Sequence, residues 1–310
     1  MADADPQPPP APERVHIPVL LAEVREALAA RPGARILDGT VGAGGHAAAI
    51  APMLAPGGLY VGVDRDPEIL ALAGARLAGL GPLVRLVRGT FDDLEALAKE
   101  HAPGGFDGIL LDIGVSSLQL DRPERGFSFG ADGPLDMRMD PDQLESAEHV
   151  VNRTPEEDLA NIIYQFGEER LSRRIARAIV EARRRAPIRT TGELADLVTR
   201  TLPRGYEKGR IHPATRTFQA LRIYVNDELG MLERAIAALP AALAPGGRAA
   251  VIAFHSLEDR IVKHALRDAA KAGTLEVLTK KPIEAGQPEL QANRRSRSAK
   301  MRVARRPDAP

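Results

Sequence analysis

The chain of 310 residues carries equal numbers of acidic and basic residues, 42 of each, and contains no cysteine. The absence of cysteine excludes disulfides, thiolate zinc sites and cysteine nucleophiles. No apolar run approaches the ~18 residues needed to span a bilayer, and the first residues do not form a signal peptide. We therefore expect a cytoplasmic protein without a membrane partner, preceded by a disordered arm at 1–13.

Short apolar runs followed by turn residues predict buried parallel strands. They lie at 35–37, 59–63, 108–111 and 248–254, with a weaker one at 84–87. Ala-rich helical stretches at 46–54 and 67–79 separate the first three strands. This alternation predicts a doubly wound α/β fold, and 275–279 with 299–303 are candidates for a C-terminal hairpin.

The strand–helix alternation stops after Gly114 and resumes near Phe218. Between these points the pattern predicts helices at 155–165, 168–186 and 192–201. Thr154 and Thr190 have the spacing to glutamate that is typical of helix N-caps. We therefore expect one sheet domain, formed by 14–118 and 218–310, with a helical insert at 119–217 that recognises the substrate.

The charges are unevenly distributed along the chain. Residues 121–169 include 13 acidic and 4 basic side chains, whereas 170–222 include 14 basic and 4 acidic ones. Such segments form either solvated helix surfaces or polyanion-binding faces. In the basic tail we favour RNA binding, through Arg294, Arg295, Arg297, Lys300 and Arg302.

The first predicted strand runs into a glycine-rich turn, with Asp38 at its mouth and Gly42, Gly44 and Gly45 within it. Asp64 ends the next strand, where an acid can bind ribose hydroxyls. The spacing also fits a dinucleotide fingerprint, but a carboxylate at Asp38 would repel a pyrophosphate. S-adenosylmethionine has no phosphate and carries two cationic groups, so it suits this turn better.

Two further strand ends carry polar side chains that are candidates for catalysis. Asp112 and Ser116 follow the strand at 108–111, and His255 follows the strand at 248–254. Ligands of open α/β sheets bind at this carboxyl edge. A simpler role as helix cap remains open for Ser256, together with Asp259.

The missing cysteine also limits the acceptor of a methyl group. Methylation at carbon 5 of cytosine needs a covalent adduct, usually through a thiolate, which this chain lacks. An amine or a hydroxyl acceptor remains. Asp112 or the carbonyls of 113–115 can accept hydrogen bonds from a cytosine amine, which must first be unstacked and aligned with the donor.

These motifs together resemble the bacterial 16S rRNA (cytosine-N(4))-methyltransferases. The similarity runs from about His16 to Arg305 and depends on a series of segments in a fixed order rather than on any one of them. These segments lie at 16–23, 38–46, 64–66, 106–112, 114–119, 125–129, 134–139, 218–226, 254–262 and 295–300.

The resemblance implies a class I (Rossmann-like) S-adenosylmethionine-dependent methyltransferase sheet with an inserted helical domain. It implies methylation of a cytidine N(4) in the decoding region of 16S rRNA, with the 30S subunit as partner; the sequence itself shows no metal-binding cluster. It also implies donor contacts at Gly44, Gly45, His46, Asp64, Phe91, Asp112 and Gln119.

Three rival functions remain open. The glycine pattern admits an NAD-dependent oxidoreductase, although no hydride-transfer dyad is evident. The basic segments admit a non-catalytic RNA-binding module, which would leave the glycine-rich turn and Asp64 unexplained. A DNA amine methyltransferase is the closest rival, but its Asp/Asn-Pro-Pro-Tyr tetrad is absent after the fourth strand, where Asp112 to Val115 stand instead. We therefore expect no DNA partner.

Overall fold

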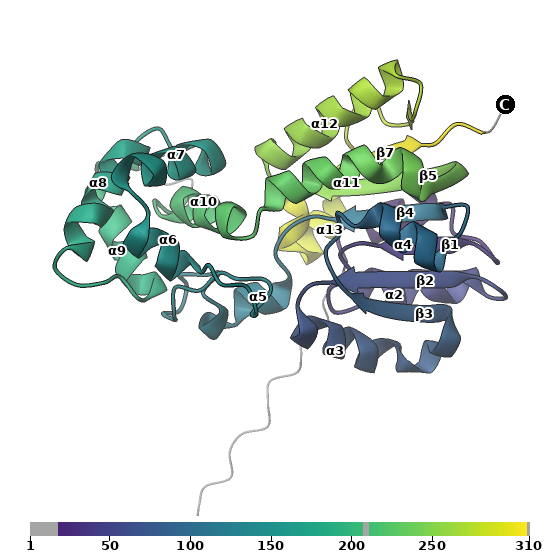
Figure 1. Cartoon of the computed structure of the whole chain (residues 1–310), viewed down its shortest axis with the longest axis horizontal. Coiled ribbons are helices and arrows are strands. Elements are labelled where there is room, and N and C mark those ends of the chain that lie inside the picture. Colours follow the sequence, from purple (N-terminus) through teal and green to yellow (C-terminus); the bar gives the residue numbers. More distant parts are fainter. Residues whose placement is uncertain (1–17, 207–210, 309–310) are drawn as a thin grey trace, which may run out of the picture.

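The computed structural model describes residues 18–206 and 211–308, so the predicted arm at 1–13 and His16 lie outside the described part. The described chain forms a sheet region covered by helices and a separate helical region beside it (Figure 1). None of the described helices is long and apolar enough to cross a membrane.

The sheet has seven strands in the order β3-β2-β1-β4-β5-β7-β6. β7 runs antiparallel to β5 and β6, and the other pairs are parallel. This confirms the doubly wound α/β prediction, including the weaker strand and the C-terminal pairing. The strands are β1 (Arg35–Asp38), β2 (Leu59–Asp64), β3 (Val84–Arg88), β4 (Phe106–Asp112), β5 (Leu243–Ala253), β6 (Glu276–Val277) and β7 (Lys300–Arg305).

Apolar side chains on both sheet faces explain why the central strands are almost continuously hydrophobic. In β1, Ile36 packs into one buried cluster and Leu37 into the other. The first face is covered by α1 (Leu21–Ala27), α2 (Gly45–Ile50) and α3 (Pro67–Leu77). The second is covered by α4 (Leu94–His101), α11 (Glu228–Ala242) and α12 (Ser256–Lys271).

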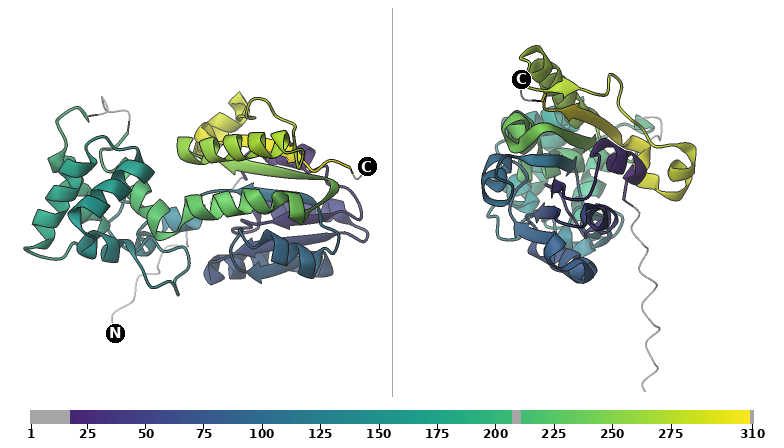
Figure 2. Two further views of the ribbon diagram at one scale, coloured as in Figure 1. Left: turned by 45° about the horizontal axis from the view of Figure 1, so that its top comes forward. Right: turned by 90° about the vertical axis from the view of Figure 1, so that its right-hand side faces the viewer.

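The helical region has its own apolar core, which runs from Phe127 to Val225 and is distinct from the two sheet clusters. Figure 2 shows this region as a separate lobe, joined to the sheet through α10 and α11. Its helices are α6 (Ala147–Arg153), α7 (Glu156–Gly167), α8 (Ser172–Arg183), α9 (Thr191–Thr201) and α10 (Thr215–Val225).

The insert extends further than the sequence pattern indicated. The predicted boundary between 217 and 218 falls inside α10, whose Phe218, Leu221 and Val225 belong to the insert core. The chain returns to the sheet region only at α11. A boundary based on strand–helix alternation missed this, because α10 is one continuous helix that packs mainly on α7.

The predicted helix caps had mixed outcomes. Thr190 forms the expected capping box with Glu193. Thr154 makes no cap, since α7 begins after Pro155 without a side-chain cap hydrogen bond.

Two short helices complete the set of described α-helices. α5 (Ser117–Asp121) lies beside the sheet's carboxyl edge, and α13 (Gln287–Ala292) lies in the C-terminal segment.

Candidate active site

A cavity of about 1080 Å³ opens at the carboxyl edge of the sheet. It is enclosed by the turn after β1, the ends of β2, β4 and β5, and residues of α10 and α11. Most of the predicted site residues line it, although they come from separate parts of the sequence. These are Gly42, Gly45, His46, Asp64, Phe91, Asp112, Ser116, Gln119 and His255.

Asp38 was predicted to contact the donor, but it does not line this cavity. Its carboxylate is buried and accepts hydrogen bonds from the Tyr60 hydroxyl at 2.7 Å and from the Thr40 amide at 3.0 Å. Burial raises the pKa of Asp38. The Thr40 hydroxyl accepts from the Asp112 amide at 2.7 Å. Asp38 thus shapes the turn and, through Thr40, supports the end of β4.

Gly44 is a second correction, because it too lies outside the cavity lining. Its φ of 78° is in the left-handed region, and a Cβ there would lie 3.1 Å from Leu77 of α3. The glycine is therefore required for close packing of α2 against α3, and for the conformation that starts α2. Gly44 contributes to the donor site by setting the backbone path of the glycine-rich turn.

Asp64 occupies the position at the end of β2 where an acid can meet a ribose. One carboxylate oxygen accepts from the Gly42 amide at 3.2 Å and the other from the Asp66 amide at 3.0 Å. Burial raises the pKa of Asp64 to about 6. The carboxylate is thus held by two backbone amides and ionised at neutral pH, which suits it to accept hydrogen bonds from hydroxyl groups.

His46 and Asp112 face each other in the cavity wall, with His46 Nε2 3.6 Å from Asp112 Oδ2. Burial lowers the pKa of His46, but the Asp112 carboxylate outweighs it, and the net pKa lies above the usual value. Asp112 Oδ1 and both His46 nitrogens are buried without a hydrogen-bond partner among the described residues. A buried carboxylate oxygen without a partner is a position at which a bound ligand can supply the missing hydrogen bond.

The turn after β4 carries Ser116, which was predicted to be catalytic. Gly114 has a φ of 124°, which lets the chain leave the strand sharply. Ser116 Oγ accepts from the Gln119 amide at 3.2 Å, and Gln119 Oε1 accepts from the Ser116 amide at 3.1 Å. Ser116 lines the cavity, yet its hydroxyl acts as the N-cap of α5.

His255 was also predicted to be catalytic, and the structure gives it a capping role. It is the N-cap of α12, a role that the sequence had suggested for Ser256. His255 Nδ1 accepts from the Glu258 amide at 3.4 Å, and Nε2 lies 3.0 Å from Glu258 Oε1. Both nitrogens therefore face Glu258, and the imidazole is not positioned as a base. Ser256 Oγ instead donates to Glu168 Oε2 at 2.6 Å.

Glu228 and Glu258 lie close to His255, and these three side chains are of the types that bind metal ions. Oxygens of Glu228 and Glu258 and a His255 nitrogen lie within 4.8 Å of one another. However, both Glu228 oxygens accept from the Arg222 guanidinium, each at 2.8 Å. Arg222 thus occupies both oxygens of Glu228 at the cavity wall, so this carboxylate already has a cationic partner.

The residues of the predicted RNA-binding tail separate into different environments. Arg302 is a correction: it is buried on β7 and bonded to Asp259 at 2.7 Å, so it cannot meet a phosphate. Arg295 lines the cavity and donates to Ser117 Oγ at 2.5 Å and to the Val115 carbonyl at 3.2 Å. Arg297 is exposed and Lys300 half-buried, and the side chain of Arg294 lies outside the described part.

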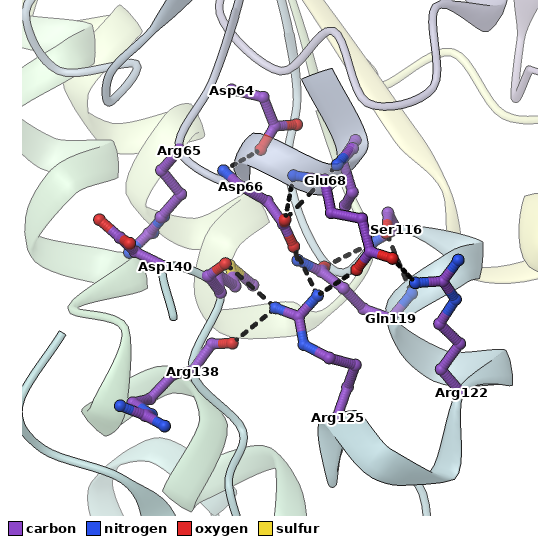
Figure 3. A network of polar contacts seen from close by, with 12 residues as sticks. Asp64, Arg65, Asp66, Glu68, Ser116, Gln119, Arg122, Arg125, Arg138 and Asp140 are labelled. Atoms are coloured by element: carbon purple, nitrogen blue, oxygen red, sulfur yellow. Dashed lines mark hydrogen bonds and ion pairs between the residues drawn. The ribbon is translucent and has the colours of Figure 1, made fainter. Parts of the chain in front are cut away.

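Sequence reasoning missed Asp66 and Arg125, which hold the site together, and gave Gln119 only a donor contact, through the family resemblance (Figure 3). Asp66 lies two residues after Asp64, and its carboxylate accepts hydrogen bonds from the side chains of Gln119 and Arg125. The sequence spacing gave no sign of this, since Gln119 and Arg125 lie more than 50 residues further along. The local sign of a structural role here was a second acidic residue, Asp66, two positions after Asp64.

The cavity suits a cationic nucleoside. It offers the carboxylates of Asp64 and Asp112, the orphaned Asp112 oxygen, and the aromatic ring of Phe91. S-adenosylmethionine combines a ribose, an adenine, a sulfonium and an amino group, and it lacks the phosphates that such carboxylates would repel. The residues present therefore fit this donor.

This site, together with the antiparallel β7 in an otherwise mostly parallel sheet, identifies the chain as a class I S-adenosylmethionine-dependent methyltransferase. The model of the MraW methylase family matches residues 13–307, and the chain belongs to that family.

Similar proteins are found in several bacteria and cover nearly the whole chain. A protein of Trichlorobacter lovleyi is 51% identical over 93% of this chain and 97% of its own length. One of Acidobacterium capsulatum is 53% identical with the same coverage, and one of a Methylobacterium species is 51% identical over 95% and 92%. All three are named ribosomal RNA small subunit methyltransferase H.

Proposed function

We propose that this chain transfers a methyl group from S-adenosylmethionine to N(4), the exocyclic amine, of a cytidine in the decoding region of 16S rRNA, within the 30S subunit. The observation that carries the RNA substrate is the full-length similarity, at 51–53% identity, to proteins named as small-subunit rRNA methyltransferases. The amine is supported by the cavity, which offers acceptors for amine protons, and by the absence of cysteine.

The donor side of the cavity is formed by residues from three strand ends. In this proposal Asp64 accepts hydrogen bonds from the ribose hydroxyls, and Phe91 packs against the adenine. His46, in the first turn of α2, faces Asp112 at the end of β4, where Asp112 offers its orphaned oxygen to a cationic group. When bound, S-adenosylmethionine supplies an electrophilic methyl group on its sulfonium.

On the acceptor side, Asp112 and the carbonyls of 113–115 are the groups that meet the cytosine amine. The amine is a poor nucleophile, because its lone pair is delocalised into the ring. Hydrogen bonds from its protons to these acceptors favour a tetrahedral nitrogen with an available lone pair. Catalysis then depends mainly on alignment of the nitrogen with the methyl group, and we assign acceptance of the released proton to the Asp112 carboxylate.

Phe127 and Phe129 belong to the loop at 125–139, and two alternatives exist for their rings: packing on the flipped base or packing on the insert. Phe127 is buried in the insert core. The ring of Phe129 lies 4.6 Å from His212 and 4.8 Å from Phe218, between centroids. The structure favours the second alternative for both rings, and Met139 is the residue of this loop that lines the cavity.

An exposed row of arginines on the insert supplies a surface for RNA. Arg173, Arg174 and Arg177 lie on one exposed face of α8, at spacings of three and four residues, and Arg170 is exposed in the turn just before this helix. The opposite face of α8 is buried. Arg177 lies 3.6 Å from Glu156, and the other three form no ion pair with a described residue. We call these four residues the arginine ridge.

The arginine ridge begins close to the cavity. Glu168, two residues before Arg170, bonds Ser256 at 2.6 Å and Arg260 at 3.1 Å at the start of α12. Ser256 directly follows His255 in the cavity wall. Phosphates bound along the ridge would therefore belong to RNA whose target base enters the adjacent cavity. This surface replaces the role that the sequence had suggested for Arg302.

The test is methyl transfer from labelled S-adenosylmethionine to 30S subunits that lack the modification, followed by digestion to nucleosides. We expect the label in N(4)-methylcytidine. Label in another nucleoside would overturn the acceptor while keeping the donor and fold. Transfer to duplex DNA in preference to 30S subunits would overturn the RNA substrate.

A further inference from the structure

The carboxylate of Asp66 is fully buried at the junction of β2 and α3. Oδ1 accepts from the amides of Glu68 at 3.1 Å and Ile69 at 3.4 Å, so it caps the first turn of α3. The Asp66 amide donates to Asp64 Oδ1 at 3.0 Å. Asp66 is thus fixed to the donor side of the cavity by its own backbone and by the helix that it starts.

The second oxygen of Asp66 faces the acceptor side (Figure 3). It accepts from Gln119 Nε2 at 3.1 Å and from Arg125 Nη1 at 2.7 Å. Gln119 is the residue whose carbonyl oxygen holds the Ser116 amide, in the turn after β4. One oxygen atom therefore orients the turn that carries Ser116 and, through Arg125, a second segment.

That second segment is the acceptor loop, residues 125–139. Arg125 Nη2 donates to the carbonyls of Arg138 at 3.0 Å and Met139 at 3.2 Å, and the Met137 amide donates to the Arg125 carbonyl at 3.1 Å. Arg125 therefore closes the loop on itself and ties its far end to Asp66. The side chain of Arg125 is 16% exposed, so these bonds are shielded from water.

The charges make this tie strong. The Asp66 carboxylate is buried, and Arg125 forms an ion pair with it at 2.7 Å. Charge-assisted bonds of this kind are stronger than neutral ones, and removal of one partner leaves an uncompensated buried charge. Glu68 also lies near, with Oε2 3.8 Å from Arg125 Nη1. Yet it is half exposed, so water screens its charge and it cannot replace Asp66.

We propose that Asp66 and Arg125 are positioning residues, which hold the Ser116 turn and the acceptor loop in register with the donor-binding end of β2. This inference rests on the proposed function, because it assigns the loop to the acceptor. Asp66 does not line the cavity, so it acts through Gln119, Met139 and the loop backbone. Loss of the tie is expected to misplace the acceptor more than the donor.

The key variant is Asp66→Asn. Asparagine is as good an N-cap as aspartate, so α3 keeps its cap while Arg125 loses its charge partner. Arg125→Met removes the same pair from the other side. Arg31→Lys is the matched control, since Arg31 forms an arginine–aspartate pair with Asp107 at the opposite edge of the sheet. Thermal unfolding of each variant establishes that it is folded.

The first measurement is amide hydrogen exchange of the free enzyme over 125–139, which needs no substrate. Both variants are expected to exchange about 10-fold faster there, with the sheet strands unchanged. The control is expected to match the wild type. Unchanged exchange in Arg125→Met would overturn the tie, whatever the substrate of the enzyme.

The second measurement separates donor binding from turnover on 30S subunits. We expect kcat/KM for the RNA to fall about 10- to 100-fold in both variants, with the donor Kd changed less than about 3-fold. The double variant is expected to be no worse than either single one. Equal losses in donor affinity and turnover would overturn the positioning role. Absent methyl transfer by the wild type would overturn the proposed function, while the exchange result would still decide the tie.

Discussion

The cavity at the sheet edge and the arginine ridge of the insert offer opposite charges to their proposed ligands. The sheet places the carboxylates of Asp64 and Asp112 inside the cavity, whereas the insert exposes Arg170, Arg173 and Arg174 to solvent. A small cationic donor must be enclosed, and enclosure strengthens each electrostatic contact. A long polyanion is bound at the surface, where release of its counterions contributes to affinity. Each region thus has the charge and the shape that its proposed ligand requires.

The two regions also differ in how their functional residues are held. Sheet residues are placed by the backbone, because strand ends and the turns after them are fixed by the ladder. Residues of the insert are placed by side chains that reach distant backbone groups. Asn226, for example, donates to the Met137 carbonyl and accepts from the Met139 amide, each at 2.8 Å. Substitutions should therefore have local effects in the sheet and wider effects in the insert.

The largest expected effect is on the sheet side, at Asp112. Asp112→Asn removes the charged acceptor for the amine, so we expect the rate constant for methyl transfer to fall about 100-fold or more. Single-turnover kinetics at saturating donor would measure it. The control is Asp107→Asn, at the amino end of the same strand, where Asp107 pairs with Arg31. A rate within threefold of the wild type for Asp112→Asn would contradict the assignment.

The second effect concerns donor affinity alone. Asp64→Ala removes charge-assisted hydrogen bonds to the ribose, which is expected to cost about 1.5–3 kcal/mol. Isothermal titration of the enzyme with S-adenosylmethionine would measure the change in Kd. An unchanged Kd would exclude Asp64 from the donor site.

The pH dependence of donor binding sharpens this prediction. Burial raises the pKa of Asp64 to about 6, so its charge is lost as the pH falls through that value. Donor affinity is therefore expected to decrease between pH 7 and pH 5. The folded state binds this proton more tightly than the unfolded state, so this group favours folding as the pH falls. Asp64→Asn should lack the transition; its persistence in that variant would assign it to another group.

The third effect is on the insert side. Replacement of the four arginines of the ridge with glutamine is expected to weaken 30S binding by about 10- to 100-fold at low salt, and to reduce the salt slope by about 0.7–0.9 per lost phosphate contact. Filter binding over a range of salt concentrations would measure both. The control is Arg267→Gln on α12, an exposed arginine that is paired with Asp268. An unchanged slope would mean that the ridge is only solvated.

The smallest effect is expected at His255. A substitution there distinguishes a helix-capping role from a role as catalytic base. His255→Asn preserves an N-cap side chain but loses the contact with Glu258, so it should destabilise the protein by about 1 kcal/mol. Methyl-transfer rates should stay within threefold of the wild type, and thermal unfolding would report the stability. A large loss of rate without loss of stability would return His255 to the catalytic residues.

The sheet was predictable from the sequence because its signals are local. Apolar runs and the turns after them located the strands, and Asp64 and Asp112 at strand ends identified the cavity. The buried position of Asp38 was not predictable, since it depends on Tyr60, which lies 22 residues away on β2. Charge alone also misassigned Arg302, because sequence spacing does not reveal that Asp259 pairs with it.

The insert was less predictable, for a related reason. Its helices follow from periodicity, but α10 showed no break at Phe218 that would mark where the sheet region resumes. The tie between Asp66 and Arg125 joins residues 59 positions apart through one buried oxygen atom. Contacts of this kind are set by tertiary packing and leave no periodic pattern.

The central claim is that the sheet region binds the donor and the insert binds the RNA. It is tested most directly by measuring both affinities in one variant of each region. The Kd for S-adenosylmethionine and the Kd for 30S subunits would both be determined for Asp64→Ala and for the variant with all four ridge arginines replaced. We predict that Asp64→Ala weakens only donor binding and that the ridge variant weakens only 30S binding. Loss of both affinities in both variants, or of the wrong one in either, would contradict the account.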